Sequence, residues 1–342
     1  MPSRQLAAGA ARDLAAQLLE AYGAGQEQAE IVASHLVEAE ESGLPSHGLI
    51  RVPQYIDEIL AGEIRPRSLP AVRQTGPGRI TIDASRCFGQ VAGELAVRRG
   101  SQLADEGGLA LVTVRQCAHA GRIGAYAEQL GIAGFLSVIF CSGPRSGHRV
   151  APFNGREGRL ATNPIAFSIP TSGWPIVGDF STGATPEGRI RTLRNLGRPA
   201  PEDTLLDALG QPTTDPEVLY SDPPGVILPL GGGRLGHRGF ALGLLVEAMA
   251  TLLTGDETAD TLRVGNNLAF AVIRTDADYP RRADRMADYI RSAAPSGPAR
   301  VLLPGDLERQ RRSAATRITV EDTTWQAIAK RAARAGVALP AS

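Results

Sequence analysis

The spacing of apolar residues divides the chain into helical and extended segments. Leucine, isoleucine, valine and alanine recur every three or four positions, as on a helix with one buried face, over residues 5–22, 26–42, 53–61, 90–107, 121–130, 279–293 and 321–336. Residues 239–254 are apolar almost throughout, although they include Glu247. This run is short for a membrane span and predicts a buried helix.

Short apolar runs between these helices predict strands. They cover a segment with a Gly-Pro-Gly turn at 72–83, a segment that ends at Asp179, and residues 109–114, 135–140, 165–170, 225–230 and 268–273. Residues 184–222 mix helix and loop. The alternation of strands and helices predicts an α/β or mixed α+β fold.

The chain length is enough for about two domains at roughly 150 residues per domain. We expect an N-terminal helical region, residues 1–70, that packs with residues 280–342. We expect a mixed-sheet domain over residues 71–279, with a helical excursion near 184–222.

The net charge and the cysteine content argue against several classes of protein. The formal net charge is zero, so no overall field attracts nucleic acid or an anionic membrane. Arg-Gln-Arg-Arg at 309–312 is a small basic cluster, typical of a solvated helix face. The three cysteines, Cys87, Cys117 and Cys141, match no zinc or disulfide spacing. We therefore expect reduced thiols, no metal, and a cytoplasmic protein without a signal peptide.

One glycine-rich segment suggests a phosphate loop. GGGRLG at 231–236 fits GxGxxG between a predicted strand and a predicted helix. Backbone N–H groups at a helix start attract phosphate. The segment after that helix, TGDETADTLRVGNN, is polar and loop-like, whereas a Rossmann unit needs a returning parallel strand. We expect a phosphate contact in another fold, or a glycine turn that packs a helix on a sheet.

A second segment concentrates acid/base and cationic side chains. GLPSHGLIRVPQY at 43–55 places Ser46, His47 and Arg51 between Pro45 and Pro53. Histidine is suited to proton transfer near neutral pH, and arginine binds carboxylates in a bidentate manner. A helical turn would place His47 and Arg51 on one face. Alternatively, Ser46 caps a short turn and His47 lies on the surface.

Several segments together resemble the type-2 malate/L-lactate dehydrogenase family, which includes sulfolactate and ureidoglycolate dehydrogenases and piperideine-2-carboxylate reductase. The matching segments lie in family order and include SHGLIRVPQYIDEILAGEI, CAHAGRIGAYAEQ, RLATNPIAFSIP, DFSTGATPEGRIR, ILPLGGGRLGHRGFALGLLVEAMATLLTG and RVLLPGD. The resemblance implies a non-Rossmann NAD(P)-binding sheet domain with a helical N-terminal region. It also implies a homodimer, with NAD or NADP as cofactor and NAD preferred.

The resemblance assigns roles to individual residues. It implies that His47 and Ser46 are the acid/base and its relay, and that Arg51 binds substrate with Thr162. His119 competes with His47 for the acid/base role, and capping of the following helix is its alternative. The implied cofactor contacts are His119, Ala120, Gly121, Ser142, Asn163, Asp179, Phe180, Ser181, His237, Arg238 and Gly239.

The implied reaction moves hydride between nicotinamide and a small 2-hydroxy acid, yielding its 2-keto acid. Two alternatives stay open: a cyclic imine or keto-acid reductase, and a cofactor-binding homologue without catalysis. At the position of Arg189, the resemblance implies an aspartate in the imine-reducing branch of the family. The absence of that aspartate here favours hydroxy-acid oxidation. The family's usual Asn-His-Phe is here Ala118-His119-Ala120, a change that motivates the inactive alternative. Neither nucleic acid nor a membrane is expected as a partner.

Overall fold

A mixed seven-stranded sheet forms the centre of the molecule in the computed structural model, which describes residues 3–255 and 265–340. Its strand order is β2-β3-β4-β11-β5-β6-β7. The bounds are β2 Ala71–Gly76, β3 Arg79–Asp83, β4 Leu109–Cys117, β5 Phe135–Ser142, β6 Ile165–Ile169, β7 Ile176–Phe180 and β11 Asn266–Arg274. Only β3 and β4 pair in parallel in the described sheet, so the predicted mixed α/β class is confirmed and no Rossmann order appears there.

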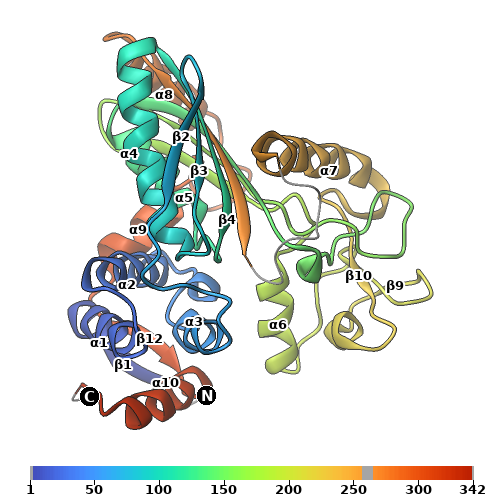
Figure 1. Cartoon of the computed structure of the whole chain (residues 1–342). Helices are drawn as coiled ribbons and strands as arrows, with labels where there is room; N and C mark the ends of the chain where they lie inside the picture. Colours follow the sequence, from blue (N-terminus) through green and yellow to red (C-terminus); the bar gives the residue numbers. More distant parts are fainter. Residues whose placement is uncertain (1–2, 256–264, 341–342) are drawn as a thin grey trace.

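Two helices cover this sheet (Figure 1). Helix α4, Gly89–Gly107, packs on β4 and β11, and α5, Ile123–Ile132, packs on β5 and β6. Gly93 allows the close approach of α4 to α5, because a Cβ there would lie 2.3 Å from the Tyr126 ring. A third helix, α8 at Tyr279–Arg291, contributes Ala287 to a small apolar cluster with Ile176 of β7.

The N-terminal helices pack with the C-terminal end of the chain (Figure 1). The bounds are α1 Ala8–Ala21, α2 Gln26–Glu41, α3 Arg51–Leu60, α9 Asp306–Ala314 and α10 Asp322–Ala335. Strand β1, Ser3–Leu6, pairs antiparallel with β12, Ile318–Glu321. The prediction of helix from residue 5 was therefore wrong, because the partner strand that pairs with β1 lies at the far end of the sequence. Helix α9 contains the basic cluster at 309–312, which the sequence analysis interpreted as a helix face without giving bounds.

A smaller lobe with its own apolar cluster lies beside the sheet (Figure 1). It contains α6 Glu187–Asn195, β8 Leu205–Leu206, β9 Pro212–Thr213, β10 Val226–Ile227 and α7 Gly232–Val246. The predicted strand at 225–230 is only two residues long. Helix α7 begins seven residues before the predicted start and continues into a π-helical turn, Glu247–Thr251. Most of the predicted polar loop at 254–267 lies outside the described residues.

Two further features concern the whole chain. None of the helices within the described ranges combines the length and apolar character needed to cross a bilayer. The division into residues 1–70 with 280–342 and residues 71–279 stays a prediction, and α8 packs on the sheet domain.

Candidate active site

A short 3-10 helix, Pro45–His47, places the Ser-His pair between α2 and α3 of the N-terminal helical region. Glu40 of α2 accepts a hydrogen bond from the Leu49 N–H at 2.8 Å. Gly48 permits this approach, because a Cβ there would lie 2.2 Å from the Glu40 carboxylate. The backbone leaves the helical conformation at Gly48, so His47 and Arg51 do not share one continuous helical turn.

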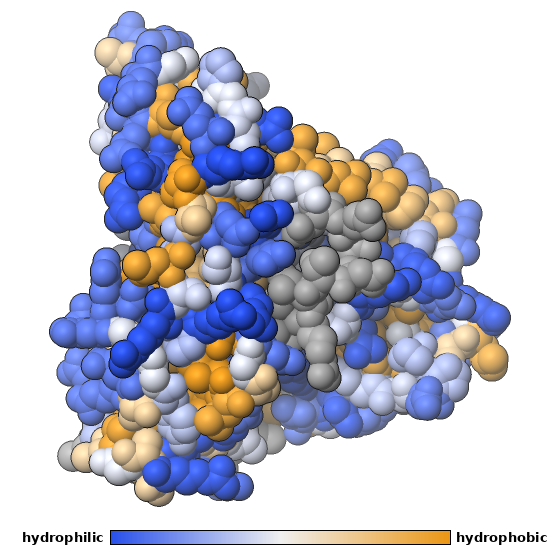
Figure 2. Space-filling model, viewed as in Figure 1, coloured by the Kyte–Doolittle hydropathy of each residue, from blue (hydrophilic) through white to orange (hydrophobic). Residues whose placement is uncertain are grey.

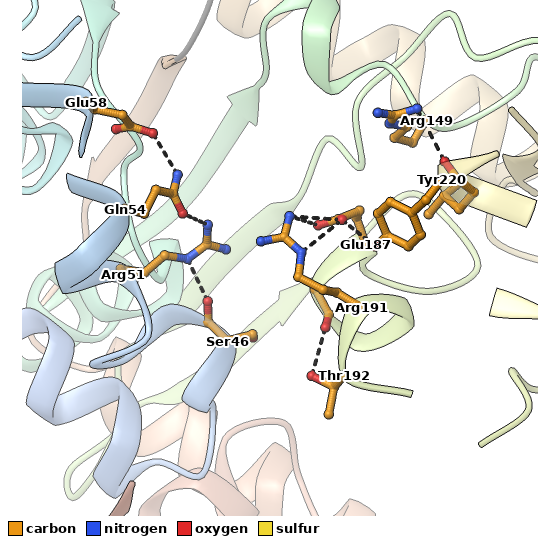
Figure 3. A network of polar contacts seen from close by, with 11 residues as sticks. Ser46, Arg51, Gln54, Glu58, Arg149, Glu187, Arg191, Thr192 and Tyr220 are labelled. Carbon is orange, nitrogen blue, oxygen red and sulfur yellow. Dashed lines mark hydrogen bonds and ion pairs between the residues drawn. The ribbon is translucent and has the colours of Figure 1, made fainter. Parts of the chain in front are cut away.

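Arg51 nevertheless lies beside the Ser-His pair. Its Nε donates to the Ser46 carbonyl oxygen at 2.7 Å, and its Nη1 donates to Gln54 Oε1 at 2.7 Å. Figure 3 shows these contacts on one side of the guanidinium. Ser46 Oγ lies 3.1 Å from His47 Nδ1, so the serine can orient the imidazole. Ser46, His47 and Arg51, which the sequence analysis identified as candidates, therefore lie together in one local cluster.

The tertiary structure brings His119 to the same place. The imidazole rings of His47 and His119 are stacked, with centroids 5.7 Å apart and planes inclined by 24°. His119 follows β4, whereas His47 comes from the loop before α3. The two histidines that compete for the acid/base role therefore occupy one site.

A directional hydrogen-bond chain fixes His119. Gln90 Nε2 donates to the Tyr55 hydroxyl at 2.8 Å, and that hydroxyl lies 2.8 Å from His119 Nδ1. The Gly121 N–H also donates to Nδ1, at 3.3 Å. Because a backbone N–H can only donate, Nδ1 is the acceptor and the proton of the neutral ring resides on Nε2. His119 thus presents an N–H donor.

Both imidazoles are neutral at physiological pH. Burial, and after it the positive charge of Arg51, lowers the pKa of His47 to about 3. The same two causes lower the pKa of His119 well below its usual range. Each ring therefore keeps one nitrogen lone pair that can accept a proton.

The two histidines and Arg51 line one cavity of about 420 Å³, here called the histidine cavity. Thr162 and Gly121 also line it, as the resemblance implied. Across the cavity, Arg191 of α6 is held by Glu187, with N···O distances of 3.0 Å, and Tyr220 donates to the same carboxylate (Figure 3). The small lobe therefore closes the side of the cavity that faces α3.

A second cavity of about 600 Å³, here called the apolar cavity, shares His47, Ser46 and Gly121 with the first. Its apolar walls are Phe167, Trp174, Val177, Leu302, Leu303 and Leu307. Asp179, Phe180 and Ser181, three predicted cofactor contacts, also line it. The two cavities meet at Ser46 and His47, an arrangement that suits a reaction between two molecules.

Polar groups in the apolar cavity are few and specific. The Gly124 N–H donates to the Asp179 carboxylate at 2.8 Å. Asp179 is accessible from the cavity yet surrounded by protein, and this desolvation raises the pKa of its carboxyl group. Arg122 is 4% exposed; its Nε has no hydrogen-bond partner, and its Nη2 lies 3.6 Å from the Glu128 carboxylate.

Some predicted contacts do not reach either cavity. Ser142 and Asn163 are buried and take part in a network under the π-helical turn. Asn163 Nδ2 donates to Glu247 at 2.8 Å, and Ser142 Oγ lies 2.6 Å from Thr251 Oγ1. Ala120 is also buried, and its N–H donates to Asn266 at 2.8 Å. These groups form hydrogen bonds with other residues of the protein and do not line either cavity.

The glycine-rich segment begins helix α7, where a carboxylate already accepts a backbone N–H. Asp203 Oδ1 accepts from the Gly233 N–H at 2.8 Å, so a carboxylate already occupies the start of α7 and would repel phosphate. His237 and Arg238 are exposed one turn into the helix, away from both cavities. Gly239 packs against the Leu230 backbone, where a Cβ would lie 2.4 Å from the Leu230 nitrogen.

Sequence reasoning missed several residues that line a cavity or contact His119. Gln54, Tyr55 and Glu58 follow Arg51 on α3 at spacings of three, four and seven, which is a detectable one-face signal. Arg191 carried no such signal, because its relation to Arg51 depends on how the small lobe folds. The same holds for the Leu302–Leu303 segment.

Comparison with known proteins gives this site its context. The family described as Malate/L-lactate dehydrogenase matches residues 6–329. An L-lactate dehydrogenase of Cupriavidus necator is 33% identical over 96% of this chain and 97% of its own length. An NADP(+)-dependent (2R)-3-sulfolactate dehydrogenase of Chromohalobacter salexigens is 34% identical over 74% of this chain and 73% of its own.

Solved structures agree with these relatives. The sulfolactate dehydrogenase of Methanocaldococcus jannaschii superposes with a TM-score of 0.87 at 25% identity, over 98% of both chains. The fold, the near-complete coverage and the shared order of segments lead to one conclusion. The chain belongs to the malate/L-lactate dehydrogenase family and is an oxidoreductase of the hydroxy-acid dehydrogenase type that uses a nicotinamide cofactor.

Proposed function

We propose that this enzyme oxidises a small, malate-like or lactate-like 2-hydroxy acid to its 2-keto acid, and catalyses the reverse reduction. The observation that carries the proposal is the stacked pair His47 and His119 beside the Arg51 guanidinium in the histidine cavity, with His47 also lining the apolar cavity. Alcohol oxidation needs a base at the hydroxyl oxygen and a cation for the carboxylate. The histidine cavity offers both.

Arg51 is the proposed carboxylate anchor. It forms no ion pair with any residue in the described parts of the chain, and its hydrogen bonds go to neutral oxygens of Ser46 and Gln54. An uncompensated guanidinium in a partly buried site favours an external anion. Its planar fork can bind the C1 carboxylate and the neighbouring 2-oxygen in fixed register.

The two histidines divide the proton chemistry. His119 donates its Nε2–H to the 2-oxygen, since Tyr55 and Gly121 hold Nδ1 as an acceptor. His47 is the proposed base: we assign its ring proton to Nδ1, 3.1 Å from Ser46 Oγ, which leaves Nε2 free to accept the hydroxyl proton. Ser46 then orients the ring and connects it to solvent. Thr162 lines both cavities and is proposed to contact substrate.

The nicotinamide end of the cofactor fits the apolar cavity. Apolar walls suit a planar ring, and the guanidinium of Arg122 adds a buried positive charge to the lining of the cavity. Asp179, Phe180, Ser181 and Gly121 would hold it there. When bound, the cofactor supplies or accepts the hydride at C2 of the substrate. The chain's own groups orient the substrate and move the proton.

We favour NAD over NADP. The basic cluster at 309–312 is the candidate for a 2′-phosphate site, and two of its arginines are used internally. Arg312 pairs with Glu128, and Arg309 Nη2 lies 3.8 Å from the Asp306 carboxylate. The NADP(+)-dependent relative is the reason to test both cofactors.

We also propose a homodimer in the cytoplasm. Helix α7 and the turns after it expose Leu235, Leu244, Leu245 and Leu252, and Figure 2 shows an apolar band over this helix. Contiguous exposed leucines are typical of a covered surface. The three cysteines are free and buried, which supports a reducing compartment.

The test is the absorbance change of the reduced nicotinamide with malate, lactate, sulfolactate, ureidoglycolate and their keto forms, with NAD and NADP. Turnover of a 2-hydroxy acid supports the proposal. Reduction of a cyclic imine alone would establish the reductase alternative. Dinucleotide binding by calorimetry without turnover on this panel would establish the inactive alternative.

A further inference from the structure

Helix α3 carries a cation, an amide and a carboxylate along one face of the histidine cavity. Arg51, Gln54 and Glu58 follow one another at spacings of three and four residues, and all three line the cavity. Arg51 Nη1 donates to Gln54 Oε1 at 2.7 Å, and Gln54 Nε2 donates to Glu58 Oε1 at 2.7 Å. Figure 3 shows the three side chains in this order.

The side-chain amide of Gln54 forms a hydrogen bond with each of its two charged neighbours, Arg51 and Glu58. Its oxygen faces the guanidinium and its NH₂ faces the carboxylate, so each charged group obtains a hydrogen bond without contacting the other. Glu58 is 7% exposed, and its Oε2 has no hydrogen-bond partner. This carboxylate is therefore the nearest competitor for the positive charge of Arg51 on the helix.

The opposite wall does not neutralise Arg51 either. Arg191 faces it across the cavity, and Glu187 is bound to Arg191 at 3.0 Å (Figure 3). The pKa of Arg51 is lowered, chiefly by burial and also by the charge of Arg191. An anion that enters between the two guanidinium groups relieves this repulsion.

We propose that Gln54 is a positioning residue that separates Arg51 from Glu58 and so keeps the guanidinium available to the carboxylate of the substrate. The inference rests on the proposed function only in naming Arg51 as the carboxylate anchor. Without the amide, Arg51 and Glu58, two helical turns apart, can reach each other and form an internal ion pair. That pair would compete directly with the substrate.

The experiment measures binding of oxalate to the full chain by calorimetry, because its adjacent carboxyl groups imitate the C1 carboxylate and 2-oxygen of a 2-keto acid. Gln54→Glu places a carboxylate on Arg51 with almost no change in shape, and we expect oxalate affinity to fall about tenfold or more. Gln54→Met should weaken binding because Glu58 takes the guanidinium. Adding Glu58→Gln to Gln54→Met should restore most of the affinity.

Gln102→Glu is the matched control. Gln102 accepts from Arg99 at the same spacing of three residues, but on an exposed part of α4 outside both cavities. This variant should bind oxalate as the wild type does. Thermal unfolding of every variant verifies that the fold persists.

The possible results of these binding experiments either support or overturn the role of Gln54. Wild-type affinity in Gln54→Glu, or no rescue of Gln54→Met by Glu58→Gln, overturns the inference. Oxalate binding that does not depend on Arg51, tested with Arg51→Ala, overturns it as well. If the expected pattern appears in a chain that turns over no 2-hydroxy or 2-keto acid, the inference holds and the proposed function fails.

Discussion

His47 and His119 lie face to face, 5.7 Å apart between ring centroids, although one precedes α3 and the other follows β4. Their hydrogen bonds differ. His47 Nδ1 contacts the Ser46 hydroxyl, whereas His119 Nδ1 accepts from a buried tyrosine and a backbone N–H. Two imidazoles at one site can therefore perform different tasks, and the predictions below separate them.

Replacing His47 should remove most of the activity. His47→Ala deletes the proposed base, and we expect kcat to fall by about 10²–10⁴-fold. His119→Ala should also lower the rate, through loss of a hydrogen bond to the 2-oxygen. Steady-state assays with the best substrate compare the two variants. A fully active His47→Ala beside an inactive His119→Ala would show that the base was assigned to the wrong histidine.

Tyr55→Phe should affect both stability and rate. The hydroxyl accepts from Gln90 and donates to His119, so its removal leaves a buried amide N–H without a partner. This costs about 1–3 kcal/mol of unfolding free energy. His119 also loses the contact that fixes its tautomer, so kcat should fall while substrate KM changes less. Unchanged kcat would contradict the role assigned to the hydroxyl.

Arg51→Lys should weaken substrate binding while the charge is kept. A lysine cannot reproduce the planar fork or contact Ser46 and Gln54 together. Loss of a charge-assisted hydrogen bond costs about 1.5–3 kcal/mol, so KM for the acid should rise roughly 10- to 100-fold. The control is the cofactor KM, which should stay near its wild-type value. Equal rises in both would indicate a general disturbance of the site.

His35 should make the protein less stable as the pH falls. Its Nε2 accepts from the Arg122 N–H at 3.1 Å, and burial lowers the pKa of this imidazole to about 3. Below the usual value near 6.5 the unfolded chain binds a proton that the folded chain does not. The free energy of unfolding therefore decreases by about 1.4 kcal/mol per pH unit for this one group, between about pH 6 and 4.

His35→Gln keeps an acceptor for the Arg122 N–H but cannot titrate. Its free energy of unfolding, measured by denaturant titration at several pH values, should depend less steeply on pH. His237→Gln on the exposed face of α7 is the control and should leave the slope unchanged. An identical slope in His35→Gln would refute the assignment.

Asp203→Ala should cost stability without improving cofactor binding. Asp203 holds the Gly233 N–H at the start of α7, and loss of such a helix-end contact costs about 1 kcal/mol. Because the apolar cavity lies elsewhere, dinucleotide affinity measured by calorimetry should not change. A marked gain in dinucleotide affinity would instead support the glycine-rich segment as a phosphate site.

Local sequence patterns determined much of the architecture. Helical periodicity identified α1, α2, α4, α5, α8 and α10, and apolar runs identified the strands of the large sheet. These features follow from side chains close in sequence, which share one face of a helix or strand. The motif at 46–51 was also readable, because Ser46, His47 and Arg51 contact one another locally.

Tertiary structure decided what depends on distant partners. Strand β1 forms because β12 supplies its hydrogen bonds. At the start of α7, Asp203 accepts the Gly233 N–H, which the glycine-rich sequence alone left available to a phosphate. The lowered pKa values of His47 and His119 arise chiefly from burial, which no local pattern encodes. Proton affinity depends on the surrounding dielectric and charges, and only the folded chain fixes both.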